Sequence, residues 1–338
     1  MIKPENNFFL FGMGDREKYI YKNYSLRRYK DNSIVFACKG TKEEFIYDEY
    51  TVILTLENGS KIVLKEDEEG FYINDTCLSS SRINLPSFAE YKYSKLLRIL
   101  HHEILINIID GKPVPNYFVY DTPWYRDSAM MGMVLKETNN LHLIKDWMLS
   151  LTELYDKNNG MEEPDNLGQL LYLISLVSDK NNPMVQKIID ESMRILKDGI
   201  LTGVTDFGDH TIYSTLWLRY GLEQLGLSTE FLIIPERFDN YARMFWMDRK
   251  GIERTTPFEN EYNSLYPYLW WATKHFEEEE IDEKYLQIGY PLSWEKEASQ
   301  AKYEKIKQLS IEYAENKFSA PHTWHASEMF LYLITMRS

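Results

Sequence analysis

The stretch Tyr117-Phe-Val-Tyr-Asp-Thr-Pro-Trp-Tyr-Arg-Asp-Ser-Ala-Met-Met131 crowds aromatic side chains, two acids and an arginine just before an apolar run. Pro123 disfavours helix at Thr122, so the chain before it is extended or turning. Asp127 and Ser128 stand where a helix would begin, and their side-chain oxygens can accept hydrogen bonds from its free N–H groups. The stretch therefore predicts a loop that leads into a buried helix.

The residue types of this loop suit a sugar ring. Trp124 offers a flat apolar face, Arg126 offers a planar fork of donors, and Asp121 and Asp127 offer acceptors. A sugar stacks its C–H face on aromatic rings and pairs its hydroxyls with carboxylate and guanidinium groups. We therefore expect these four residues to bind carbohydrate. A buried Arg–Asp ion pair that locks the loop to the helix would use the same residues.

The composition excludes several classes of partner. The 338 residues carry a formal net charge of −14, which argues against a nucleic-acid backbone or an anionic membrane as partner. The two cysteines, Cys38 and Cys77, show no metal-ligand spacing and predict no disulfide framework. The N-terminus lacks a signal-peptide pattern, and no apolar run approaches the length of a membrane span. We expect a cytoplasmic protein, and the oligomeric state is not predictable from the sequence.

Residues 1–85 predict a β-rich N-terminal region. Asn58-Gly59 lies between two apolar, β-branched runs, and this dipeptide is a strong hairpin signal because both residues tolerate positive φ. The predicted strands are Ser33–Cys38, Tyr50–Leu56, Lys61–Leu64 and Phe71–Ile73. They predict a small antiparallel sheet, too short to hold a rich core of its own, that packs on the rest of the chain.

From Pro86 the hydrophobic period becomes helical. The pattern predicts helices at 87–109, 127–137, 140–155, 166–178, 183–198, 211–225, 235–247, 261–276, 295–315 and 324–336. If neighbouring helices run antiparallel, every second loop lies on the same face. That face collects the loops rich in acids, histidine and aromatics, at 110–126, 156–165, 199–212, 248–260 and 316–323. We therefore expect one polar, functional end.

Three motifs in this region resemble those of the six-hairpin glycosidases, the glucoamylase- and trehalase-like superfamily. They are Trp124-Tyr-Arg-Asp127, Asp165-Asn-Leu-Gly-Gln169 and His322-Thr-Trp-His-Ala-Ser-Glu-Met-Phe-Leu-Tyr-Leu333. The resemblance covers residues 86–338 and implies a mainly α fold, an (α/α) toroid of helical hairpins with a carbohydrate cleft at one end. It implies a catalytic-like domain at 86–338 beside the β-rich region at 1–85.

Glu162, Glu163 and Asp165 are the candidates for a general acid. Carboxylates that share a loop raise one another's pKa, so that one can remain protonated. Asp165 is equally suited to cap the helix that follows it. We expect Arg126 and Asp127 to grip the sugar rather than react with it, because the neighbouring guanidinium favours the ionised form of Asp127.

A second carboxylate is also expected. The resemblance implies inversion, which requires a base about 6.5–9.5 Å from the acid to activate water. The candidates are Asp209, Glu259, Glu261 and Glu295. Glu295 follows Tyr290-Pro-Leu-Ser-Trp294, a sequence typical of a sugar-binding loop. Simple alternation of helices places Glu295 on the opposite face, but residues 281–294 could span roughly 45 Å if extended.

His322, Trp324, His325 and Asp209 complete the predicted sugar-binding set. No third histidine or cysteine lies near the two histidines, so we expect no metal and no cofactor. These residues predict a glycoside hydrolase that cleaves an oligosaccharide with paired carboxylates. The alternatives are a sugar epimerase or polysaccharide lyase, with His325 or a tyrosine as proton carrier, and a non-catalytic carbohydrate-binding protein.

Overall fold

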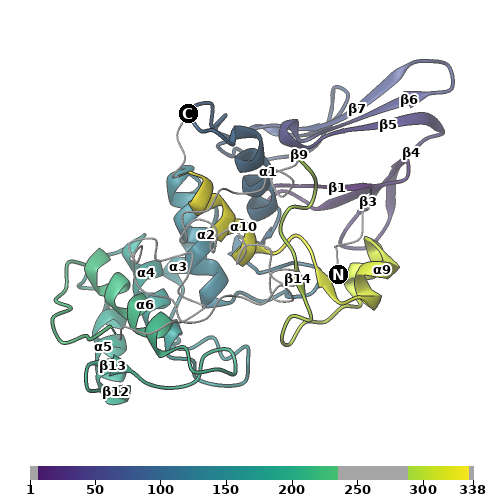
Figure 1. The fold of residues 1–338 in the computed structure, drawn as a ribbon. Helices are drawn as coiled ribbons and strands as arrows, with labels where there is room; N and C mark the ends of the chain where they lie inside the picture. Colours follow the sequence, from purple (N-terminus) through teal and green to yellow (C-terminus); the bar gives the residue numbers. More distant parts are fainter. Residues whose placement is uncertain (1–6, 235–287, 335–338) are drawn as a thin grey trace.

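The N-terminal part of the protein is built from nine antiparallel strands in two sheets (Figure 1). The computed structural model describes residues 7–234 and 288–334. The first sheet has the order β1 (Phe8–Phe11), β2 (Tyr19–Lys22), β3 (Ser25–Arg28) and β4 (Ile34–Ala37). The second has the order β5 (Gly40–Ile46), β6 (Thr51–Leu56), β7 (Lys61–Glu66), β8 (Gly70–Ile73) and β9 (Thr76–Ser80).

Strand β1 is buried along its whole length because it is covered on both faces. On one face, the ring of Phe11 stacks on Phe71 of the second sheet, with 4.3 Å between centroids. Phe9, two residues earlier on the same face, stacks on His102 of helix α1 (Ser94–Leu105) at 4.8 Å, and on the opposite face Phe8 packs edge to face against Tyr313 at 5.9 Å. Such two-sided burial suits a continuous apolar run rather than an alternating one. The aromatic core therefore joins both sheets to the first helix.

The hairpin prediction is confirmed, but the size of the β-region was underestimated. Strands β6 and β7 pair in antiparallel register around a turn in which Gly59 has a φ of 82°. The expected small single sheet is replaced by two sheets that share a core. Strands β1, β2, β3, β5 and β9 were not predicted, and in β1 the reason is that complete burial removes the alternation of apolar and polar residues.

Eight α-helices occur in the described residues. After α1 they are α2 (Tyr125–Glu137), α3 (Lys145–Leu149), α4 (Asp165–Ser175), α5 (Pro183–Ile195), α6 (Thr211–Gln224), α9 (Ile311–Glu315) and α10 (Thr323–Leu333). Three two-stranded hairpins accompany them: β10 (Ile108–Ile109) with β11 (Lys112–Pro113), β12 (Leu196–Lys197) with β13 (Ile200–Leu201), and β14 (Glu295–Lys296) with β15 (Phe318–Ser319).

The prediction of a mainly α fold, an (α/α) toroid, is wrong. Nine strands in two sheets precede the helices, and the helices of the described residues do not form the implied toroid. The predicted helix at 295–315 is instead strand β14, a 3₁₀-helix at Lys305–Gln308 and the short α9. Glu297 and Gln300 have positive φ, which ends any helical path there. The predicted helices at 235–247 and 261–276 lie outside the described residues.

A series of neighbouring helices carries the candidate site. Helix α1 packs on α10, α10 on α2, α2 on α4, and α4 on α6 (Figure 1). The last contact brings backbones together, because a Cβ on Gly168 would lie 2.2 Å from the carbonyl carbon of Trp217. Only glycine permits this approach, and it fixes the position of Asp165 at the start of α4.

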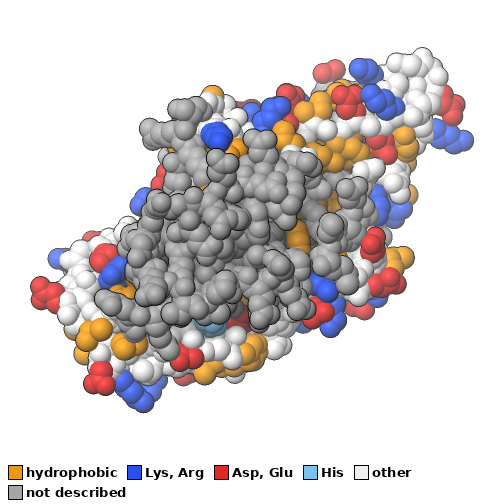
Figure 2. All heavy atoms as spheres, viewed as in Figure 1, with side chains coloured by type: hydrophobic (Ala, Val, Ile, Leu, Met, Phe, Trp, Pro, Cys, Tyr) orange, Lys and Arg blue, Asp and Glu red, His pale blue; other side chains and the backbone are white. Residues whose placement is uncertain are grey.

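Figure 2 shows acidic and basic side chains interspersed over the described part of one face. None of the described helices is long and apolar enough to cross a membrane.

Candidate functional site

Arg126, in the first turn of α2, joins two acidic residues from the start of α4 and the loop before it. Its Nε donates a hydrogen bond to Asp165 Oδ2 at 3.0 Å, and its Nη2 donates to Glu163 Oε1 at 3.3 Å. All three side chains are buried. The guanidinium carbon lies 5.7 Å from the ring centroid of Trp324 on α10. Segments far apart in the sequence therefore meet at one arginine.

The two acids beside Arg126 are held differently. Asp165 accepts further hydrogen bonds from Gln169 Nε2 at 2.7 Å and from Thr205 Oγ1 at 3.1 Å. These bonds bind Asp165 to both α4 and the loop before α6, which is a positioning role. Glu163 accepts hydrogen bonds from the Asn159 side chain and the Asp206 backbone N–H. Burial raises the pKa of Glu163 against the opposing effect of Arg126.

Asp127 follows Arg126 in the sequence, but its carboxyl group has a higher pKa than an ordinary aspartate. Its Oδ1 accepts a hydrogen bond from Thr323 Oγ1 at 3.2 Å, which ties α2 to the start of α10. Burial raises the pKa of Asp127 to about 6, although His322 and Arg126 act in the opposite direction. Arg126 does favour the ionised form of Asp127, as expected, but the loss of hydration on burial outweighs it, so the pKa of Asp127 is raised overall.

Glu295 of β14 pairs with His322, the residue before α10. The His322 Nε2 atom lies 2.9 Å from Glu295 Oε2, and 14% of the Glu295 side chain is exposed. Burial alone would lower the pKa of His322, but the Glu295 carboxylate raises it. The Glu295 carboxylate also raises the pKa of Asp127, so the two groups interact. The sequence-based alternation that put Glu295 on the opposite face is thus corrected.

Aromatic and imidazole rings lie next to the Glu295–His322 pair. The Tyr120 ring is 5.3 Å from that of Trp124 and 6.1 Å from that of His322, centroid to centroid. The rings of His322 and His325 are 4.8 Å apart. His325 Nδ1 donates a hydrogen bond to the carbonyl oxygen of Trp294. Burial and the neighbouring His322 hold the pKa of His325 well below its usual value.

Glu328 is a member of the cluster that the sequence analysis missed. Its Oε1 accepts a hydrogen bond from Trp324 Nε1 at 2.9 Å. Burial raises the pKa of Glu328 to about 8, and the charge of Asp127 acts in the same direction. An isolated glutamate on a helix usually faces water, so the residue type alone did not predict that Glu328 is buried in the site. The four-residue spacing from Trp324 was the available signal, since such residues share a helix face.

Several buried polar atoms around Asp127 have no hydrogen-bond partner within the described residues. They are Ser128 Oγ, His322 Nδ1, Ser327 Oγ and Glu328 Oε2. Most buried polar atoms in folded proteins are satisfied, so a group of exceptions requires an explanation. These atoms are both donors and acceptors, and all of them are buried, so they mark unsatisfied polar groups inside the cluster.

The structure leaves three predicted site residues at the surface. Glu162 pairs with Lys157 at 3.0 Å, and Asp121 pairs with Lys305 at 3.3 Å; all four side chains are about half exposed or more. Asp209 is exposed and accepts a hydrogen bond from the Thr211 N–H. Glu259 and Glu261 lie outside the described residues. The remaining predicted residues, Trp124, Arg126, Asp127, Glu163, Asp165, Glu295, His322, Trp324 and His325, are brought together.

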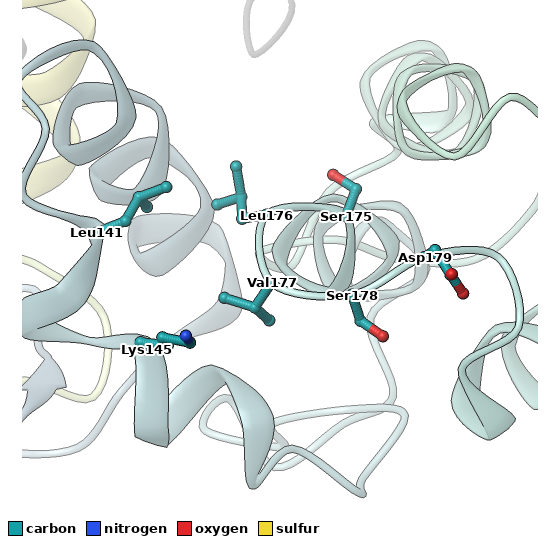
Figure 3. Close-up of a pocket in the computed structure, with 7 residues that line it drawn as sticks. All are labelled: Leu141, Lys145, Ser175, Leu176, Val177, Ser178 and Asp179. Atoms are coloured by element: carbon teal, nitrogen blue, oxygen red, sulfur yellow. The ribbon is translucent and has the colours of Figure 1, made fainter.

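A metal centre and a surface pocket are the other candidates for a functional site. Within the described ranges, no group of three or more His, Cys, Asp or Glu residues could hold a metal ion. A surface pocket at the end of α4 has two charged side chains, Lys145 and Asp179, among the described residues that line it (Figure 3). It lacks the paired carboxyl groups and aromatic faces of the Arg126 cluster, which is therefore the candidate site.

Comparison with known proteins gives no assignment: no protein-family model, no curated protein and no solved structure matches the chain. The resemblance to six-hairpin glycosidases is contradicted by the nine N-terminal strands and by the arrangement of the described helices. Function must therefore be inferred from the chemistry of the buried cluster alone.

Proposed function

We propose that the protein is a glycoside hydrolase, with Asp127 as general acid and Glu295 as general base. One observation carries this proposal: a buried carboxyl group with a pKa of about 6 interacts with a second, partly exposed carboxylate held by a histidine. Two carboxyl groups in unlike environments are the recurring pattern for acid–base cleavage of a glycosidic bond.

The proposed reaction uses each carboxyl group once. Protonated Asp127 gives its proton to the glycosidic oxygen as the bond to the anomeric carbon breaks. Glu295 takes a proton from a water molecule, whose oxygen attacks that carbon. A pKa near 6 supports the acid role, because a general acid works best when its pKa is close to the operating pH. We expect inversion at the anomeric carbon, which NMR of the first-formed product would test.

The rest of the cluster supports binding of a neutral sugar. Trp124 and Trp324 supply flat apolar faces, and Arg126 is already paired with Glu163 and Asp165. Carboxyl groups outnumber cations among the described residues here, so an anionic sugar would meet net repulsion. The expectation of a carbohydrate ligand remains a proposal, and so does a cytoplasmic location.

The epimerase or lyase alternative has less support from the geometry. It requires a side chain that exchanges protons near neutral pH, and His325 or a tyrosine was expected to be that side chain. The pKa of His325 is far below its usual value, and its Nδ1 hydrogen is committed to a backbone carbonyl. Such an imidazole stays neutral and is a weak base.

The direct test is hydrolysis of a panel of neutral di- to hexasaccharides by matched variants. Asp127→Asn and Glu295→Gln should each lower kcat by about 10²- to 10⁴-fold, the usual worth of acid–base catalysis. Glu162→Gln, which changes a surface carboxylate paired with Lys157, is the control and should retain full activity.

Substrates with a good leaving group separate the two roles. On 4-nitrophenyl glycosides the Asp127→Asn variant should be partly spared, because the leaving group needs little protonation. The Glu295→Gln variant should remain impaired, because water must still be activated. Full activity of both variants on the oligosaccharides would refute this assignment. A folded wild-type protein that cleaves no member of the panel would refute the proposed function.

A further inference from the structure

A strained turn beside the cluster presents an exposed aromatic ring. Thr205 and Gly208 exchange backbone hydrogen bonds of 3.0 and 2.9 Å across the two residues between them. Those two residues, Asp206 and Phe207, have φ values of 46° and 63°. Positive φ at both central positions defines the tight turn that normally contains Asn-Gly. Phenylalanine is an unfavourable residue there because its Cβ is crowded in the left-handed region.

Packing does not explain the presence of Phe207. Its side chain is 57% exposed and lies outside the hydrophobic core. An exposed ring in a strained position contributes little to stability, and glycine or asparagine would suit the turn better. Strain that persists without a packing reason points to a functional role for the residue.

The turn is fixed to the candidate site through Asp206. The Asp206 N–H donates to Glu163, and its carboxylate accepts hydrogen bonds from Ser299 at 3.2 Å and Asn159 at 3.4 Å. Ser299 lies four residues after Glu295. Three hydrogen bonds therefore fix Asp206 at the edge of the cluster, and Phe207 is the next residue along the chain.

We propose that Phe207 is the stacking platform of a second sugar subsite, adjacent to the unit whose bond is cleaved. The inference rests on the proposed function, because it takes the Asp127–Glu295 pair as the position of the reacting bond. An exposed phenyl face is apolar and rigid, and it matches the C–H face of a pyranose ring. The site would then select oligosaccharides over monosaccharide derivatives.

The test compares Phe207→Gly, Phe207→Asn and Phe207→Tyr with the wild-type protein. Glycine and asparagine accept positive φ, so both remove the ring without adding strain, and their melting temperatures should equal or exceed that of the wild type. Tyrosine keeps the ring. The readouts are KM and kcat on the neutral oligosaccharide panel and on 4-nitrophenyl monosaccharides.

We expect Phe207→Gly and Phe207→Asn to raise KM for oligosaccharides by about 3- to 10-fold, the range for one aromatic contact. KM for the monosaccharide derivatives and kcat for both classes should stay unchanged, and Phe207→Tyr should resemble the wild type. An equal effect on all substrates, or none, would overturn the subsite while leaving the proposed hydrolase intact.

Binding measurements separate failure of this inference from failure of the proposed function. If the wild type cleaves nothing, titration of the same oligosaccharides by calorimetry still tests the ring. Binding that weakens in Phe207→Gly but not in Phe207→Tyr would support the subsite and refute the hydrolase. Absence of binding as well as cleavage would overturn both.

Discussion

Two buried arginines of this protein, Arg16 in the β-region and Arg126 in the helical region, pair with carboxylates in different ways. Arg16 binds Glu66 at 3.0 Å, and its other N–H groups donate to the backbone carbonyls of Asp67, Glu68 and Ser81. Glu66 in turn accepts from the N–H groups of Gly12 and Met13. The network closes on the backbone and joins the two sheets.

Arg126 instead lies among several buried carboxyl groups. Arg126 pairs with two acids, and further carboxyl groups at Asp127, Glu295 and Glu328 interact with one another nearby. Two of these have pKa values raised far enough to hold a proton near neutral pH. Burial also raises the pKa of Glu66, so the raised pKa values alone do not separate the two regions. The difference is the number of acids: a structural ion pair needs matched partners, whereas several interacting carboxyl groups are typical of reactive sites.

Breaking the structural pair should give the largest effect on stability. Arg16→Met removes the guanidinium that pairs with the buried Glu66 carboxylate and should cost about 3–5 kcal/mol of unfolding free energy. Arg28→Met, which removes an exposed pair with Glu17, is the control and should cost less than about 1 kcal/mol. Urea unfolding measures both. A loss for Arg16→Met no larger than for the control would contradict the contrast drawn here.

A second change disturbs the scaffold of the reactive region. Gly168→Ala puts a methyl group against the backbone of α6, where side-chain movement cannot relieve it, and should cost about 3 kcal/mol. Gly289→Ala is the matched control, because a Cβ there meets nothing within 4 Å. Urea unfolding and near-ultraviolet circular dichroism are the measurements. Equal stability of the two variants would show that α4 and α6 do not approach as described.

A third effect is a pH dependence, which is small at any one pH unit and accumulates between the unfolded and the folded pKa. Glu328 has a raised pKa in the folded state, so its contribution to stability is greatest below its unfolded value near 4.5 and disappears as pH rises through about 8. Glu328→Gln should remove this dependence, which amounts to at most about 1.4 kcal/mol per pH unit in that window. Urea unfolding at pH 5 and pH 9 tests it. A stability difference between wild type and variant that is the same at both pH values would show that Glu328 is ionised.

Local signals in the sequence predicted local structure well. The Asn58-Gly59 turn follows from short-range chemistry, and α2 and α10 begin close to the predicted positions. The expected capping of α2 by Asp127 and Ser128 is wrong, because both residues lie inside the helix and no side chain caps its start. The residues of the Trp124–Asp127 and His322–His325 motifs also meet in space, because the site is made where those helices begin. Motifs of this kind describe a site and not the fold that surrounds it.

What escaped prediction depends on long-range burial. The two-sheet core needs contacts such as Phe11 with Phe71, which no local pattern encodes. The raised pKa of Asp127 also follows from burial, whereas the arginine beside it in the sequence acts in the opposite direction. Glu328 was missed because its role depends on Trp324 one turn earlier and on the loss of water around both.

The pH profile of kcat/KM for the wild-type protein on a neutral oligosaccharide tests the central claim most directly. This parameter reports the free enzyme, in which the Asp127 pKa lies near 6. The account predicts activity that falls as pH rises through about 6, because the general acid loses its proton. On a 4-nitrophenyl glycoside the same limb should be weaker. Activity that instead increases from pH 6 to pH 9 would show that no protonated Asp127 is needed, and would contradict the account.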